Sequence, residues 1–263
     1  MWNPYQTLST GKRRGFGFAS VVAVLVIWAL ITGLELVSQA KLPTPWSCVE
    51  AFIQLAWNSQ TGESPLLSAT MWSLGRVFVA GVLVVIIGVP AGVIMGASPN
   101  INALFSPLID PFRSAPVVAL LPILVMWLGI GESMKIAFLF AGAVVFLVPM
   151  VRDAILAVPQ SYWISARDLG ATEWESIYHG VLPMAKPRIA DAIIVSISVM
   201  WTYITVAEYV NAQEGLGQII SQARRMSAMN HVFVGIFVII GLALVTYSLM
   251  TTIKRKLYPW ETE

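Results

Sequence analysis

Charged side chains are scarce in this chain of 263 residues: they make up 11% of it, whereas a soluble globular domain has roughly 25%. Cysteine occurs once, at Cys48, which excludes an intramolecular disulfide and a metal site built from several cysteines. A G-x-x-x-x-G-K-[ST] phosphate-binding loop is also missing from the sequence, so the chain has no common means of holding ATP. Hydrophobic residues, in contrast, make up 57%, and lipid is therefore the expected solvent.

Six stretches between charged residues are long enough to hold a membrane helix. A hydrocarbon core of about 30 Å needs roughly 20 helical residues at 1.5 Å each. The stretches are Gly15–Leu34, Val77–Ile109, Ser114–Gly131, Ile136–Val151, Ala192–Ala207 and Met226–Ile253. A cleaved signal peptide is the alternative for the first, because three cations precede it, but the stretch is longer than the 7–15 residues of the apolar region of a signal peptide. The sequence predicts an all-α integral membrane protein of about six transmembrane helices.

Positive side chains near the span ends predict the orientation, since they favour the cytoplasmic side. With the N-terminus inside, eleven Lys and Arg residues are cytoplasmic, namely Lys12, Arg13, Arg14, Arg113, Arg152, Arg167, Lys186, Arg188, Lys254, Arg255 and Lys256. Three lie outside, namely Lys41, Arg224 and Arg225. Both termini are therefore predicted to be cytoplasmic.

Three further patterns predict local structure around the first spans. Ser47–Trp57 is expected to form a short interfacial helix with Ser47 as its N-cap. The prolines in Ala97–Ala115 exclude one continuous helix there. Glycines recur along the second span at Gly81, Gly88, Gly92 and Gly96, a pattern that permits close contact between helices.

The longest polar stretch between spans runs from Arg152 to Arg188 and predicts two short helices. Ser161 is the expected cap of the first, Tyr162–Leu169, and Gly170 is placed to end it in a left-handed conformation. Thr172 and Glu175 fit a capping box that begins the second. Pro183 and Pro187 are expected to close the unit. An amphipathic loop lying on the membrane surface is the alternative interpretation.

The residues of this stretch resemble a known motif. Ala166-Arg167-Asp168-Leu169-Gly170-Ala171 followed by Val181-Leu182-Pro183 is similar to the "EAA" coupling loop of permease subunits in ATP-binding-cassette (ABC) importers. Ile164 and Ser165 stand where the motif's glutamate is found. Further segments resemble the nitrate, sulfonate, taurine and bicarbonate branch, and they are Gly88–Gly92, Pro107–Arg113, Pro122–Glu132, Ala207-Glu208 and Gly215–Gly217.

The resemblance covers residues 65–255 and implies the fold of a type I ABC importer permease in a bacterial or archaeal cytoplasmic membrane. It implies a core domain at 65–255 with a coupling helix at 160–183, preceded by an N-terminal part at 1–64 and followed by a tail at 256–263. The implied partners are a second permease copy in a homodimer, two cytoplasmic ABC ATPases and an extracytoplasmic solute-binding protein. ATP and Mg would be bound by the ATPase, whereas this chain is expected to bind no cofactor, metal or nucleic acid and to be no enzyme.

The resemblance assigns contact with the ATPase to Ala166, Arg167, Asp168, Gly170, Ala171, Glu175, Leu182 and Pro183. The expected solute is a small anion or zwitterion such as nitrate, a sulfonate, taurine or bicarbonate. A secondary transporter or channel is the alternative, although the sequence shows neither inverted repeats nor a filter-like loop.

Five residues are candidates for the solute path, namely Arg76, Trp127, Trp201, Tyr203 and Glu208. Charges in a membrane are rare and usually face a cavity or a partner. Arg76 near the outer end of its span is expected to attract an anion. The alternative is that Arg76 and Glu208 pair with each other and that the aromatic side chains serve packing.

Overall fold

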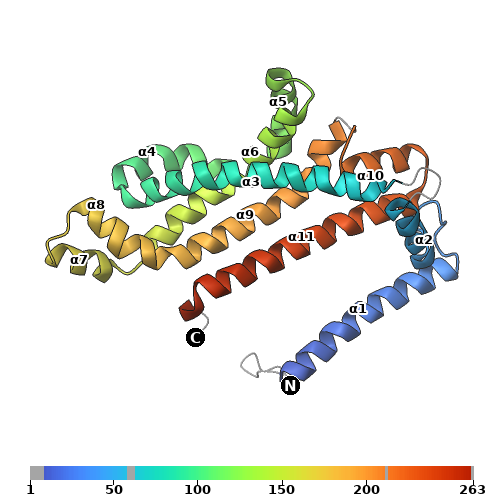
Figure 1. Cartoon of the computed structure of the whole chain (residues 1–263), viewed down its shortest axis with the longest axis horizontal. Coiled ribbons are helices and arrows are strands. Elements are labelled where there is room, and N and C mark those ends of the chain that lie inside the picture. The colour runs from blue at the N-terminus through green and yellow to red at the C-terminus, as the bar shows by residue number, and fades with distance from the viewer. Residues whose placement is uncertain (1–8, 58–62, 211–212, 262–263) are drawn as a thin grey trace. The chain divides into compact units, whose positions relative to one another are not determined.

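The computed structural model describes residues 9–57, 63–210 and 213–261, which contain helices and connecting segments but no strand (Figure 1). Residues 1–8 and 262–263 of the two predicted tails lie outside this part. The elements are α1 (Thr10–Gly33), α2 (Pro45–Ala56), α3 (Pro65–Ala97), α4 (Pro99–Ile109), η1 (Asp110–Arg113), η2 (Val117–Leu120), α5 (Leu121–Leu128), α6 (Glu132–Leu156), α7 (Gln160–Asp168), α8 (Glu173–Glu175), η3 (Ser176–Val181), α9 (Leu182–Val210), α10 (Leu216–Arg225), α11 (Met229–Leu257) and η4 (Pro259–Glu261).

Five of these helices are long and apolar enough to cross a membrane, and a bent pair brings the number to six if it counts as one span. The bent pair, Pro99–Arg113 and Val117–Leu128, turns by 99°. The break lies between Arg113 and Val117, so the third predicted stretch, Ser114–Gly131, is helical over Val117–Leu128 and forms one arm of this bent pair. Pro116 explains the bend, because it lacks an N–H and moves the preceding residue out of the helical region.

The chain divides into two compact units. The first contains Met1–Leu66 and Ile219–Ile236, and the second contains Leu67–Gln218 and Phe237–Glu263.

In the first unit, α1 is largely exposed and α2 is a short capped helix. The indole N–H of Trp28 donates to the Pro43 carbonyl at 3.0 Å. The hydroxyl of Thr44, not that of Ser47, caps α2, since it accepts the Ser47 backbone N–H at 3.2 Å. The helix therefore begins earlier than the sequence predicted, at Pro45, because proline suits the first helical position.

In the second unit, α6 packs along α9, and α3 lies against α6 at its glycines. A Cβ added to Gly92 would lie 2.6 Å from Val151 Cβ and 2.7 Å from the Val148 carbonyl oxygen. Similar contacts of 2.9 Å and 2.7 Å would arise at Gly88 and Gly96. The expected close helix contact is confirmed at Gly88, Gly92 and Gly96, where it sets the distance between α3 and α6. A Cβ on Gly81 would make only an ordinary contact of 3.6 Å with Ile197.

Replacing Gly92 by alanine is expected to destabilise the chain by roughly 1–3 kcal/mol, since overpacking forces backbone shifts. Gly75 provides a matched control on the same helix, because a Cβ there would meet nothing within 4 Å. Gly75→Ala is expected to be neutral or to stabilise slightly, as alanine favours the helix by roughly 0.5–1 kcal/mol. Unfolding of the purified variants by SDS measures both changes, and equal stability of the two would contradict close packing at Gly92.

Candidate functional site

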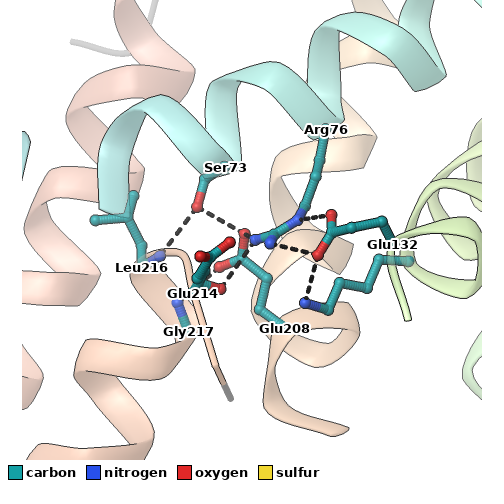
Figure 2. A network of polar contacts seen from close by, with 8 residues as sticks. Ser73, Arg76, Glu132, Glu208, Glu214, Leu216 and Gly217 are labelled. Atoms are coloured by element: carbon teal, nitrogen blue, oxygen red, sulfur yellow. Dashed lines mark hydrogen bonds and ion pairs between the residues drawn. The ribbon is translucent and has the colours of Figure 1, made fainter. Parts of the chain in front are cut away.

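The most concentrated polar site in the second unit surrounds Arg76, which lies on α3 and is 2% exposed. Its Nε and Nη2 donate to the two carboxylate oxygens of Glu132 at 2.6 and 2.7 Å. Its Nη1 donates to Glu208 Oε1 at 2.7 Å and to the Glu214 carbonyl oxygen at 3.0 Å. The two-point bond to Glu132 uses the planar guanidinium geometry that makes arginine–carboxylate pairs strong. Figure 2 shows Arg76 at the centre of these contacts.

Glu208, near the end of α9, is completely buried. Besides Arg76, it accepts the Ser73 hydroxyl on Oε1 at 2.7 Å and the Gly217 backbone N–H on Oε2 at 2.7 Å. The Ser73 hydroxyl oxygen in turn accepts the Leu216 backbone N–H at 3.0 Å. Both carboxylate oxygens are thus bonded, which is the condition under which a buried charge is tolerated.

Two glycines let the backbone before and within α10 approach these charged groups (Figure 2). Gly215 has φ +103°, and a Cβ there would collide with the Glu208 carboxylate and the Arg76 guanidinium. A Cβ on Gly217 would lie 2.5 Å from Glu208 Cβ. Only glycine fits both places without displacing the ion pair.

The network is electrically balanced. Lys135 Nζ donates to Glu132 Oε1 at 2.9 Å, so Arg76 and Lys135 match Glu132 and Glu208. The alternative that Arg76 and Glu208 pair with each other is confirmed. Attraction of an anion by Arg76 stays a prediction, and in this conformation the charge of Arg76 is neutralised by two carboxylates. The arrangement joins α3, α6, α9 and the segment before α10.

Sequence reasoning assigned no role in this site to Glu132, Lys135 or Glu214. A signal was present, because Glu132 ends one of the motifs on which the resemblance rests and Gly215–Gly217 forms another. The contacts join residues as far apart as Arg76 and Glu214 in sequence, and nothing in the local pattern fixes such pairs.

The other path candidates lie in different environments. Trp127 on α5 is 74% exposed, whereas Trp201 on α9 is buried and its Nε1 has no hydrogen-bond partner in the described part of the chain. Tyr203 packs edge-on against Phe138, with ring centroids 5.7 Å apart, and lies over Gly142. Their roles in a solute path stay predictions.

The second candidate site is the helical hairpin formed by α7, α8 and η3, shown in yellow in Figure 1. Gly170 follows α7 with φ +88°, as expected for a left-handed helix end. The Arg167 guanidinium donates to the Ala171 carbonyl at 2.8 Å and lies 5.8 Å from the centre of the Trp163 ring. The turn is thus closed by a side chain from its own helix.

The capping box of the second helix is confirmed, and other boundaries differ from the prediction. Thr172 Oγ1 accepts the Glu175 backbone N–H, while the Glu175 carboxylate accepts the Thr172 backbone N–H at 2.8 Å. Ser161 caps nothing, because α7 begins at Gln160 after Pro159.

Closure of the unit by Pro183 and Pro187 is wrong, since Leu182 and Pro183 begin α9 and Pro187 lies inside it. Helical backbone continues from Glu173 to Val210. Pro183 is tolerated in the first turn of α9, and the π-helical η3 directly before it changes the local pattern of hydrogen bonds.

The hairpin presents apolar side chains outward. Leu169, at the turn, is 89% exposed and Trp174 is 60% exposed. Among the predicted ATPase contacts, Asp168 and Glu175 are exposed, and Leu182 is half-buried. Gly180 was missed by sequence reasoning: a Cβ there would lie 3.0 Å from the Tyr162 carbonyl oxygen, so this glycine lets η3 pack on α7.

Comparison with known proteins places these features in a family. Residues 88–258 match the family described as binding-protein-dependent transport system inner membrane component. The chain is 29% identical over 249 residues to the taurine transport system permease protein TauC of Escherichia coli (strain K12), covering 93% of this chain and 89% of that protein. It is also 29% identical over 251 residues to the putative aliphatic sulfonates transport permease protein SsuC of Bacillus subtilis (strain 168), an alignment that covers 95% of this chain and 89% of that protein.

A solved structure of an ABC transporter agrees with this family assignment. The inward-facing MetNI methionine ABC transporter has a chain that superimposes with a TM-score of 0.65 at 26% identity, covering 73% of this chain and 95% of that chain. The family match covers more than half of the sequence, and the all-helical fold with several apolar helices is the one these permeases have. The chain therefore belongs to the family of binding-protein-dependent inner-membrane transport components and is a multi-pass permease of the ABC importer type.

Proposed function

We propose that this permease passes a small anionic or zwitterionic solute, most simply one with a sulfonate group, from an extracytoplasmic binding protein to the cytoplasm. Two relatives named for taurine and aliphatic sulfonates support this solute class. The main support for coupling to a separate ATPase is the helical hairpin. Its turn is held by the Arg167 hydrogen bond and by the capping box, and it exposes Leu169. Such a feature suits docking into a groove of a separate ATPase.

The hairpin is joined directly to the long helix α9. Helical backbone runs without a break over 38 residues from Glu173 to Val210, a length of about 57 Å at 1.5 Å per residue. The hairpin lies at one end and Glu208 near the other. A tilt imposed on the hairpin by closure of the ATPase would therefore move Glu208 relative to Arg76 on α3.

This geometry supports an alternating-access mechanism in which the ion network is formed in one conformation of the permease and broken in the other. The network holds α3, α6 and α9 together in the conformation described here. A ligand or partner shifts such an equilibrium only if it binds the two states with different affinity. In our proposal, closure of the ATPase and docking of the loaded binding protein supply that difference.

The remaining parts of the proposal concern assembly and orientation. Two copies of the permease would form the pore, with the hairpin and both termini in the cytoplasm. The excess of Lys and Arg at the predicted inner ends supports this orientation. ATP and Mg would be bound by the two ATPase subunits alone.

The proposal predicts that the purified permease hydrolyses no ATP, whereas its complex with the ATPase does so faster when loaded binding protein is added. The reason is that the chain lacks a phosphate-binding loop. Phosphate release from proteoliposomes measures the rates, with taurine uptake recorded in parallel. ATP turnover by the permease alone would contradict the division of labour, and uptake without ATP would favour a secondary transporter.

A further inference from the structure

A cavity of about 430 Å³ lies between α9 and α11, apart from both the ion network and the hairpin. Its lining comprises Asp191, Ile194 and Val195 on the first half of α9, and Tyr247, Thr251, Lys254, Arg255 and Tyr258 on the last turns of α11 and just after it. All of these residues belong to the second unit.

The lining follows one face of each helix. Tyr247, Thr251, Lys254 and Tyr258 are spaced by four, three and four residues, which places them in one row along α11. Seven residues separate Tyr247 from Lys254, about 10 Å along the helix axis. The polar end of the cavity is therefore at the end of a span, and its other end reaches toward the hydrocarbon.

The polar end carries a net positive charge. Lys254 Nζ donates to Asp191 Oδ2 at 2.7 Å, while Arg255 is exposed and has no acidic partner among the described residues. Among the described lining residues, the two cations and one carboxylate leave one positive charge. The Thr251 hydroxyl is buried without a hydrogen-bond partner in the described part of the chain.

Aromatic residues place this end at the membrane surface. The Tyr258 ring contacts that of Trp260 edge-on, with centroids 5.5 Å apart. Tyrosine and tryptophan are enriched at the level of the lipid headgroups, where basic pockets between helices can bind anionic lipids. The ligand that fits has an anionic group at one end and an apolar remainder.

We propose that this cavity binds an anionic phospholipid. Its phosphate accepts hydrogen bonds from Arg255 and Lys254 at the end of α11. The acyl chains run past Ile194 and Val195. Phosphatidylglycerol, with its net negative charge, matches the excess positive charge of the cavity, whereas phosphatidylcholine does not. Free phosphate has no apolar part to place against α9.

Lipid retention by the full chain tests the site. The permease is purified from nanodiscs of equal phosphatidylglycerol and phosphatidylcholine, and the lipids it keeps are counted by native mass spectrometry. Arg255→Gln is expected to lower retention of phosphatidylglycerol about fivefold, the effect of one cation near a membrane surface. Lys256→Gln removes the same charge at the next residue, which does not line the cavity, and should leave retention unchanged. An equal loss in both variants would show general surface attraction and overturn the proposal.

Replacing Asp191 is expected to change phosphatidylglycerol retention in the direction opposite to Arg255→Gln. Asp191→Asn removes the carboxylate, and with it one negative charge, from the cavity and is expected to raise phosphatidylglycerol retention, whereas Lys254→Gln lowers it. If both variants lower retention, the pair only holds α9 and α11 together and the proposal is wrong. Displacement of the lipid by inorganic phosphate would also overturn it, since the site would then recognise a soluble anion.

Discussion

Replacing Arg76 by glutamine is expected to destabilise the permease by about 3–5 kcal/mol, because it leaves the carboxylate of Glu208 buried without its cation. Glu208 is completely buried and Arg76 is 2% exposed, so water cannot compensate for the loss. Unfolding of the purified chain by SDS in mixed micelles measures the change. Arg225→Gln is the matched control, because Arg225 is exposed on α10, and its effect should stay within about 0.5 kcal/mol.

A double variant separates the cost of an unpaired buried charge from the cost of the altered side-chain packing. Arg76→Gln with Glu208→Gln removes both charges, and the single amide oxygen of the new glutamine side chain keeps an acceptor for one of the two donors bound by Glu208, the Ser73 hydroxyl or the Gly217 N–H. We expect it to be more stable than Arg76→Gln alone, since no unpaired charge remains buried. If instead Arg76→Gln folds normally and only uptake falls, the ion pair is dispensable for the fold and Arg76 acts on the solute.

Gly170→Val is expected to reduce ATP-driven uptake by about tenfold in the complex of our proposal. Gly170 has φ +88°, and an L-residue in the left-handed region costs roughly 1–2 kcal/mol, more when it is β-branched. Nothing lies within 4 Å of an added Cβ, so the effect arises from backbone strain in the turn and not from a clash. Uptake and ATP hydrolysis are measured together in proteoliposomes. For Gly170→Val, we expect ATP hydrolysis to continue while uptake falls.

Asparagine at the same position is the informative comparison. Asn adopts the left-handed conformation more readily than other non-glycine residues, so Gly170→Asn should retain most of the uptake. Ala171→Val controls for a β-branched residue at the next position, where φ is not positive. Normal uptake by Gly170→Val would show that the shape of this turn is not needed for coupling.

The features that could be predicted from the sequence are those set by local rules. The capping box at Thr172 and Glu175, the left-handed Gly170 and the close packing at Gly92 each depend on a few neighbouring residues or a regular spacing. Arg76 and Glu208 were recognised as unusual because a charge next to an apolar run is rare.

The remaining features depend on contacts between distant segments. Glu132 is 45% exposed and precedes a predicted span, so its sequence position resembles that of many surface acids. Its role follows only from the packing of α6 beside α3. Likewise, Pro183 predicts a helix end by its own chemistry, but the π-helical η3 before it allows the helical backbone to continue.

Arg76 is synthesised before the two carboxylates with which it pairs, so its position matters for membrane insertion. Arg76 precedes Glu132 by 56 residues and Glu208 by 132 residues. At roughly 5–20 residues per second, the first partner follows after about 3–11 s and the second after about 7–26 s. During this interval α3 must reside in the membrane with an unpaired cation. Arg76 immediately precedes the apolar run that begins at Val77, so its long side chain can reach the headgroups until the later helices arrive.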